Sequence, residues 1–442
     1  MRKRAMVLTL IGVLLSAVFA GCSQGGGKNA GGDPSAQNGG DADDAALTAH
    51  LTMYTDLSLS DEWFRKFVFD PVEKKFPGVK IDLVRRQQGS TPNDLVAAGS
   101  FPDILYNSTP RLTTYKDLGL LYDMRDLIKK YNFDTSRLNQ AALDAIKQWG
   151  TGQGEIYGLP FWVNWTALFY NKDIFDKFAV PYPKDGMTWE EAIELSRRLN
   201  RTEGGVNYRG LDIHDMNSFY SQLSLPYVDA KTDTALLETD GFKKVYETLL
   251  SLVKIPGNEN RPSAKDAFLK DKNLAMWPMY ADVPTWINDL IASGEKFNWD
   301  MAQMPSFKER PNVAWQVDSH NLHVTSMSNN KDAAFRVIQY LLSEEPQLHL
   351  VRNGLLSALK DENMNKRFGE SMALFEGKNV QAIFKSQPAP KYSMHKYDSI
   401  VQGEFTKAFK DVEEGTKDIN TALRDANEAA NKRIQEQKAS GK

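Results

Sequence analysis

Several short stretches of the chain combine aromatic side chains with amides and carboxylates. A sugar ring presents apolar C–H faces and hydroxyl groups, so a sugar-binding site stacks flat aromatics on the faces and directs Asp, Asn, Arg and Gln at the hydroxyls. These residue types therefore predict a site for a polyhydroxylated ligand. The stretches are Trp162-Val163-Asn164-Trp165, Trp277 with Tyr280 and Asp282, and Trp315 with Asp318.

The alternative use of these aromatic residues is packing in a hydrophobic core. Trp162 and Asn164 alternate along an expected extended segment and so share a face, whereas Trp165 takes the other face. We therefore do not expect all three to line one cleft. Core packing stays open as the alternative for Trp162, Trp165, Trp277 and Trp315.

Motifs that would indicate catalysis or a cofactor are weak or missing. The glycines of Gly150-Thr151-Gly152-Gln153-Gly154 follow an apparent helix and precede no capped one, which argues against a phosphate or dinucleotide loop. The sequence has no Gly-x-Ser-x-Gly elbow and no Walker motif. His320 and His323 lie three apart on an expected strand, so they face opposite ways and would not share a metal with Asp318. We expect no catalytic residue, no metal and no cofactor.

Composition places the chain among ordinary globular proteins. It has 442 residues, of which 41% are hydrophobic and 25% charged, and a formal net charge of −3. This length suits two or three domains, or two lobes of one chain. The near-neutral balance and the lack of a concentrated basic face argue against a nucleic-acid partner. The single cysteine excludes a disulfide framework and a thiolate zinc site.

The first residues are typical of an export signal. Arg2, Lys3 and Arg4 precede a mostly apolar stretch, 5–20, which is shorter than the roughly 20 residues of a membrane-spanning helix. The following Val18-Phe19-Ala20-Gly21-Cys22 resembles the lipobox of bacterial lipoproteins, which implies removal of residues 1–21 and acylation of Cys22. The Gly-rich residues 22–46 predict a flexible tether. The chain is thus expected on the extracytoplasmic side of the cell membrane, with a plain signal peptide as the alternative.

Alternating strands and helices must hold the candidate residues in place. The pattern predicts strands at 47–53, 79–83 and 102–106, with helices at 60–72 and 92–98 between them. This order predicts a parallel α/β sheet, in which ligands lie beyond the carboxyl ends of the strands. Those ends carry Tyr54, Asp56, Asn107 and Arg111, with helix capping by Asp56 and surface pairing of Arg111 as the alternatives.

A second block of alternating elements begins near Trp165. A strand is expected at 168–170, and helices at 175–178 and 189–199, the latter with Thr188 as its N-cap. Apolar residues at three- and four-residue spacing across 404–437 predict amphipathic helices that dock on a lobe.

Successive strings along residues 47–434 resemble the signatures of one family in their order and spacing. The strings are Lys74-Lys75-Phe76-Pro77-Gly78-Val79-Lys80-Ile81, Leu95-Val96-Ala97-Ala98-Gly99-Ser100-Phe101-Pro102-Asp103-Ile104, Tyr157-Gly158-Leu159-Pro160-Phe161, Phe169-Tyr170-Asn171-Lys172-Asp173-Ile174-Phe175, Met187-Thr188-Trp189-Glu190-Glu191, Ala267-Phe268-Leu269-Lys270 with Leu274-Ala275-Met276, and Asn329-Asn330-Lys331-Asp332-Ala333-Ala334 with Tyr340-Leu341-Leu342. Together they are similar to the family 1 extracellular solute-binding proteins of ABC importers, the maltose-binding-protein-like group.

This resemblance implies an α/β, two-lobe periplasmic-binding-protein type II fold with a hinged cleft between the lobes. The lobes would be residues 47–162 with about 311–345, and residues 163–310 with about 346–442. It also implies where the candidate residues lie: Trp162, Asn164 and Trp165 at the first crossover between the lobes, Trp315 and Asp318 near the return crossover, and Trp277, Tyr280 and Asp282 in the second lobe.

The function that the resemblance implies is capture of a carbohydrate, in particular an oligosaccharide. The partners would be the ABC permease subunits and the membrane, through the lipid on Cys22, and the chain is expected to be a monomer. Two alternatives stay open. A secreted carbohydrate-active enzyme needs only two positioned carboxylates, and the chain holds 57 acidic residues. The other alternative is a binder of another small solute.

Overall fold

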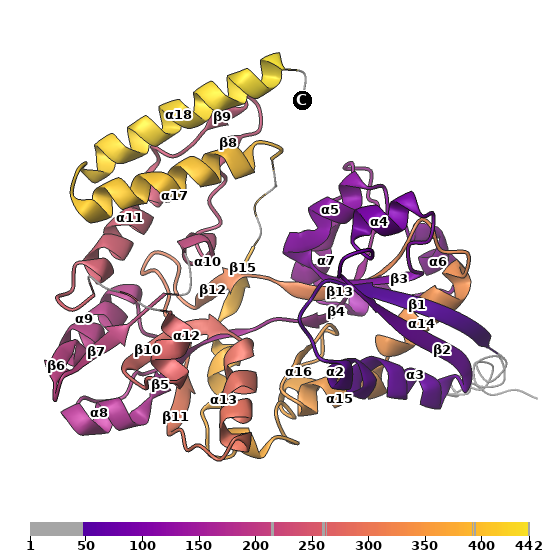
Figure 1. The fold of residues 1–442 in the computed structure, drawn as a ribbon, viewed down its shortest axis with the longest axis horizontal. Coiled ribbons are helices and arrows are strands. Elements are labelled where there is room, and N and C mark those ends of the chain that lie inside the picture. Colours follow the sequence, from indigo (N-terminus) through magenta and orange to yellow (C-terminus); the bar gives the residue numbers. More distant parts are fainter. Residues whose placement is uncertain are drawn as a thin grey trace, which may run out of the picture. The chain divides into compact units, whose positions relative to one another are not determined.

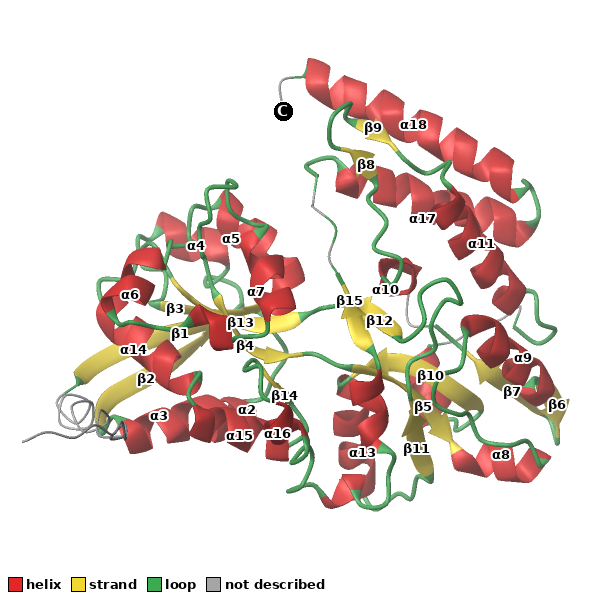
Figure 2. Ribbon diagram, turned by 180° about the vertical axis from the view of Figure 1, so that it is seen from behind, coloured by secondary structure: helices red, strands yellow, loops and turns green. Residues whose placement is uncertain are grey.

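A computed structural model of the chain describes residues 47–213, 216–258, 261, 263–390, 392 and 395–440. The expected signal peptide, Cys22 and the tether lie outside these residues. The described residues belong to one compact unit with two main sheets, each covered by helices (Figures 1 and 2). Among the described helices, none combines the length and the apolar character that crossing a membrane requires.

Six strands form the first sheet. β1 pairs in parallel with β2 and with β3, whereas β13 runs antiparallel to β3 and β4. The β2-β1-β3 arrangement confirms the predicted parallel α/β sheet and places the carboxyl ends of β1 and β3 at one edge. The strand order is β14 (Leu356–Ser357), β4 (Leu159–Val163), β13 (Ser319–Val324), β3 (Ile104–Ser108), β1 (Thr48–Thr55) and β2 (Gly78–Arg85).

Helices around the first sheet begin where the sequence offers caps. The Ser60 hydroxyl accepts the N–H of Trp63 at 3.1 Å and starts a continuous helical run over 61–75. This run confirms the predicted helix, but its middle is a π-helical turn, which apolar spacing alone does not reveal. The elements are α2 (Asp61–Phe64), η1 (Arg65–Phe69), α3 (Asp70–Lys75), α4 (Pro92–Ala97), η2 (Thr109–Arg111), α5 (Leu112–Asp117), α6 (Arg125–Lys130), η3 (Thr135–Arg137), α7 (Gln140–Lys147), α14 (Lys331–Leu341), α15 (Glu344–Arg352) and α16 (Glu362–Asn365).

Five strands form the second sheet, in the order β11 (Trp299–Ala302), β5 (Thr166–Asn171), β10 (Leu274–Tyr280), β7 (Val206–Leu211) and β6 (Arg201–Glu203). Thr188 caps α9 through a capping box with Glu191, as predicted. The other elements of this part are α8 (Lys172–Phe178), α9 (Trp189–Leu199), α10 (Met216–Ser221), β8 (Val228–Asp229), β9 (Thr234–Ala235), α11 (Asp240–Val253), α12 (Ala264–Leu269), α13 (Asp282–Ala292), η4 (Ala373–Phe375) and η5 (Val380–Lys385).

Two long helices end the described chain. α17 (Asp398–Glu414) stops at Gly415, whose φ of +75° suits glycine, and α18 (Ile419–Ala439) packs back against α17 and α11. The inward side of α18 carries buried Leu423, Ala430 and Ile434. These helices confirm the amphipathic tail that the spacing predicted.

Three segments connect the two sheets. The first crossover, residues 164–165, joins β4 to β5, and the second, residues 317–318, joins β12 (Val313–Gln316) to β13. The third runs from β14 to β15 (Gln387–Ala389), which pairs with β12. The N–H of Asn164 donates to the carbonyl of Asp318 at 2.9 Å, so the first two crossovers lie side by side.

The chain just beyond residue 345 associates with the first sheet, although the sequence assigned it to the second lobe. β14 pairs with β4, and Gln347 of α15 donates to the carbonyl of Phe161 at 2.9 Å. A two-residue strand is too short to show alternation, so no sequence pattern indicated this pairing. We propose that the first lobe also includes residues 346–359.

Candidate ligand-binding cleft

A cavity of about 680 Å³ adjoins the second crossover, where β3 ends. We call it the cleft cavity. Its walls come from η2 and α5, the end of α7, α10, the end of β10, the crossover and the start of α17. The residues are Thr109, Pro110, Thr113, Lys116, Gln148, Trp149, Asn217, Ser218, Tyr220, Ser221, Tyr280, Gln316, Val317, Asp318, Tyr392, His395, Lys396, Asp398, Ser399 and Gln402.

The carboxyl ends of β1 and β3 build one edge of this region. Thr109 follows β3, and its hydroxyl group lies 3.0 Å from the Ser319 hydroxyl and accepts from the Asn321 amide at 3.0 Å. Beside it the guanidinium of Arg111 donates to Asp56 Oδ2 at 3.4 Å. The other carboxylate oxygen of Asp56 is buried and has no hydrogen-bond partner among the described residues. The Asp56–Arg111 pair thus joins two strand ends and leaves one acceptor unused.

Aromatic side chains form much of the cleft-cavity wall. Trp149 follows α7, Tyr220 lies in α10, Tyr280 ends β10, and Tyr392 precedes α17. The hydroxyl oxygens of Tyr220 and Tyr392 lie 3.5 Å apart, and burial raises the pKa of each phenol far above its usual value. Both phenols are therefore neutral at physiological pH and serve as hydrogen-bond donors and acceptors.

Asn164 ties the crossovers to the second sheet. Its carboxamide oxygen accepts from the N–H of Trp165 at 3.0 Å and from the N–H of Ala281 at 3.4 Å. Its amide nitrogen donates to Asp318 Oδ2 at 3.5 Å. One side chain thus contacts the first crossover, the second crossover and the segment between β10 and α13.

A second cavity, of about 440 Å³, takes up other predicted residues. We call it the hinge cavity, because all three connecting segments line it. Asn164, Trp165 and Trp315 belong to its wall, and Tyr280 lines both cavities. Of the predicted residues, Tyr280 and Asp318 line the cleft cavity. The predicted set is therefore divided between two adjoining cavities.

The remaining predicted residues mostly lie in the cores. Tyr54 is buried beside Phe101 and Tyr115, and burial raises its pKa to about 12. Its hydroxyl group donates to the Ser90 carbonyl at 3.2 Å. Asn107 is fully buried, and its side-chain oxygen accepts the Ser108 N–H at 2.8 Å.

Two of the tryptophans also pack inside. The Trp162 indole donates to the Tyr106 hydroxyl at 2.8 Å, and its ring lies 4.2 Å from that of His320. Trp277 is 2% exposed and stacks on Trp286. Asp282 instead begins α13 at the surface. Position at a strand end does not determine which face a side chain takes, which explains these placements.

Several cleft-cavity residues were not predicted. Trp149 was expected to pack in a core, and Asn217, Tyr220 and Tyr392 were not singled out. They come from segments far apart in the sequence that only the fold brings together. The one local signal is an aromatic residue close to an amide, as in Gln148-Trp149 and in Asn217 with Tyr220, and this pattern is weak.

The two buried histidines of β13 have structural partners. Nδ1 of His320 lies 3.0 Å from the Tyr106 hydroxyl, and Nδ1 of His323 lies 2.7 Å from the Tyr157 carbonyl. Burial lowers the pKa of His320 to about 3 and that of His323 to about 4, so both rings are neutral. Within the described ranges no group of three or more His, Cys, Asp or Glu side chains is arranged to hold a metal ion.

Known proteins share this architecture. An arabinooligosaccharide-binding protein of Bacillus subtilis is 24% identical over 265 residues, which cover 57% of this chain and 55% of that protein. An ABC substrate-binding protein from Listeria monocytogenes, solved in complex with cycloalternan, superposes with a TM-score of 0.68 at 20% identity, covering 88% of this chain and all of that one. The sugar-binding protein MalE from Xanthomonas citri gives a TM-score of 0.65 at 18% identity, covering 88% of this chain and 98% of that one.

The aligned region thus spans only about half of the Bacillus relative, whereas the solved structures are matched along essentially their whole length. These matches show the two-lobe fold of periplasmic solute-binding proteins. The model of the bacterial extracellular solute-binding protein family matches residues 55–348. The chain belongs to this family.

Proposed function

We propose that this protein is the substrate-binding component of an ABC importer and captures a carbohydrate, specifically an oligosaccharide, in the cleft cavity. One observation carries the proposal. The cavity sets four aromatic side chains, Trp149, Tyr220, Tyr280 and Tyr392, among amides, hydroxyl groups and a carboxylate. This mixture complements the apolar faces and hydroxyl groups of a sugar.

The volume and the relatives support the same assignment. The cleft cavity, at about 680 Å³, falls within the roughly 300–1,000 Å³ of small-molecule sites. It also lies beyond the carboxyl end of β3, where open α/β sheets bind ligands. The names of the relatives mention an arabinooligosaccharide and cycloalternan. The family consists of binding proteins, and we propose a binding role without catalysis for this chain as well.

Binding would proceed by closure of one lobe over a ligand held by the other. A ligand shifts such an equilibrium only by its additional contacts in the closed state. The wall formed by Thr109, Thr113 and Trp149 belongs to the first lobe, whereas Tyr220 and Tyr280 belong to the second. A ligand that contacts both walls therefore favours the closed state, in which a monomeric chain docks on the permease subunits.

We also propose that Cys22 anchors the protein to the membrane after removal of residues 1–21. Each buried methylene of an acyl chain contributes about 0.8 kcal/mol, so two or more chains give a stable anchor without a spanning helix. Residues 22–46 would then connect the anchor to the folded lobes on the extracytoplasmic side.

The test of ligand binding is a titration of purified protein with arabino-, manno- and malto-oligosaccharides. Tryptophan fluorescence and melting temperature are followed together, because Trp149 lies in the cavity wall. We expect a saturable response to at least one series. A response only to peptides, polyamines or metal ions would overturn the carbohydrate assignment. Product analysis after long incubation would expose an enzyme, because a binding protein returns the sugar intact.

A further inference from the structure

The hinge cavity has the features of a second ligand site. Its walls come from residues 163–166, 314–317, 356–366 and 381–388, together with Asn139 and Tyr280. At about 440 Å³ it also falls within the range of roughly 300–1,000 Å³ for small-molecule sites. The first crossover, Asn164 and Trp165, contributes to the hinge cavity and is absent from the walls of the cleft cavity.

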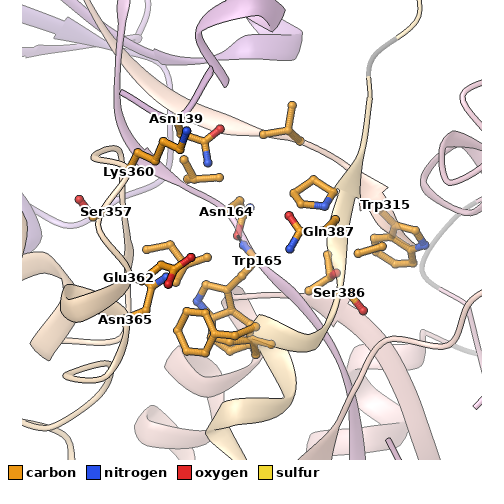
Figure 3. A pocket seen from close by; sticks show the side chains of 18 of the residues that line it. Asn139, Asn164, Trp165, Trp315, Ser357, Lys360, Glu362, Asn365, Ser386 and Gln387 are labelled. Carbon is orange, nitrogen blue, oxygen red and sulfur yellow. Dashed lines mark hydrogen bonds between the residues drawn. The ribbon is translucent and has the colours of Figure 1, made fainter. Parts of the chain in front are cut away.

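Polar groups around the hinge cavity are left without protein partners. The side chains of Lys360, Glu362, Gln381 and Gln387 make no hydrogen bond or ion pair with any described residue. Lys360 and Glu362 carry opposite charges two residues apart, yet they do not pair with each other. Figure 3 shows Gln387 pointing into the cavity from β15 and Glu362 facing it from α16 on the opposite wall. Donors and acceptors therefore face one space from two sides.

Apolar surface completes the hinge-cavity wall. Trp165 is fixed because its indole N–H donates to the Gly354 carbonyl at 3.0 Å and its ring packs edge-on against Phe368. Figure 3 places Trp165 beneath the polar groups, next to Glu362. A rigid aromatic residue beside amides and two opposite charges suits a neutral ligand with many hydroxyl groups, which donate to the carboxylate and accept from the ammonium group.

We propose that the hinge cavity binds a second small neutral polyhydroxylated molecule, of the size of a monosaccharide or disaccharide. This site is separate from the oligosaccharide site in the cleft cavity and does not depend on the proposed function. The two cavities share Tyr280, Gln316 and Val317 in their walls. Occupancy of one cavity is therefore coupled to the affinity of the other, and the coupling is reciprocal.

The test measures binding stoichiometry by equilibrium dialysis with four radiolabelled probes: L-arabinose, D-tagatose, maltose and mannobiose. Thr113→Trp closes the cleft cavity from exposed α5, and Gln387→Trp fills the hinge cavity from exposed β15. We expect that at least one probe still binds once per chain in Thr113→Trp, and that this binding is lost in the double variant. The control Gln435→Trp makes the same exchange on the exposed face of α18, outside both cavities, and should leave binding unchanged.

A second variant removes charge without adding bulk. Lys360→Met should weaken the hinge-cavity equivalent by about fivefold or more, since one charge-assisted hydrogen bond contributes about 1.5 kcal/mol or more. Lys407→Met, at an exposed position of α17, is its control. Melting curves establish that each variant is folded.

The outcomes separate this proposal from the carbohydrate assignment of the cleft. No binding of any probe to Thr113→Trp, or binding that Gln387→Trp and Lys360→Met leave intact, would overturn the hinge-cavity site. Loss of oligosaccharide binding in the wild type would instead overturn the proposed function. Coupling is tested by titrating the cleft oligosaccharide with and without the hinge probe. We expect its affinity to change by about fivefold or more, and an unchanged affinity would refute the coupling.

Discussion

Replacing Asn164 with alanine tests whether one side chain holds the connecting segments together. The substitution removes the acceptor of two backbone N–H groups, those of Trp165 and Ala281, and the donor to Asp318. The 3.0 Å bond to the Trp165 N–H is well formed, whereas the contacts of 3.4 Å and 3.5 Å are weak. The first bond therefore accounts for most of the expected effect.

A buried N–H that loses its acceptor costs about 1–3 kcal/mol. Trp165 is 4% exposed, so its N–H belongs to this class, and we expect Asn164→Ala to lower the free energy of unfolding by about 2 kcal/mol. Urea unfolding followed by tryptophan fluorescence gives this quantity. The control is Gln381→Ala, because Gln381 also lines the hinge cavity but is exposed, and a change within about 0.5 kcal/mol is expected. Equal unfolding free energies for wild type and Asn164→Ala would refute the role assigned to this side chain.

Three further predictions concern residues away from the cavities or outside the described chain. Gly158→Ala would place a Cβ atom 2.3 Å from the ring of His323, so we expect a loss of about 1–3 kcal/mol in thermal unfolding, whereas Gly403→Ala, in open space within α17, should be neutral or stabilising; equal melting temperatures would contradict the first expectation. Burial lowers the pKa of His320 to about 3 and that of His323 to about 4, so the unfolded chain takes up these protons first, and the free energy of unfolding should fall as pH drops below about 6.5. His320→Gln should reduce this slope between about pH 6.5 and 5.5 by up to about 1.4 kcal/mol per pH unit, and an unchanged slope would show that the ring titrates normally. Cys22→Ala should abolish incorporation of labelled palmitate and release the protein from the membrane fraction, and retention of both would exclude the anchor.

Regular elements were predictable from the sequence where periodicity is long. Alternation identified β1, and helical spacing with a cap identified the run after Ser60 and the helix after Thr188. The chain between α15 and β15 was assigned less well, because β14 is only two residues long and its pairing with β4 depends on distant contacts. Local pattern therefore determines single elements, whereas the association of short segments depends on the complete fold.

The candidate residues were predicted by type and place in the chain more successfully than by direction. Tyr280 and Asp318 line the cleft cavity, and Asp56 and Arg111 pair at the expected strand ends. Tyr54 follows the same logic but is turned into a small aromatic cluster. No pattern in the sequence states which side of a strand end faces a cavity, so the division between core and wall became visible only in three dimensions.

The account rests on an oligosaccharide binding in the cleft cavity, and a calorimetric titration of three proteins tests this most directly. Wild type, Thr113→Trp and Thr114→Trp are titrated with the oligosaccharide that raises the melting temperature most. Both threonines are exposed neighbours on α5, but only Thr113 lines the cleft cavity. We predict that Thr113→Trp weakens binding by about tenfold or more, a loss of about 1.4 kcal/mol, whereas Thr114→Trp matches wild type. Equal affinities for all three proteins would place the ligand elsewhere and contradict the account.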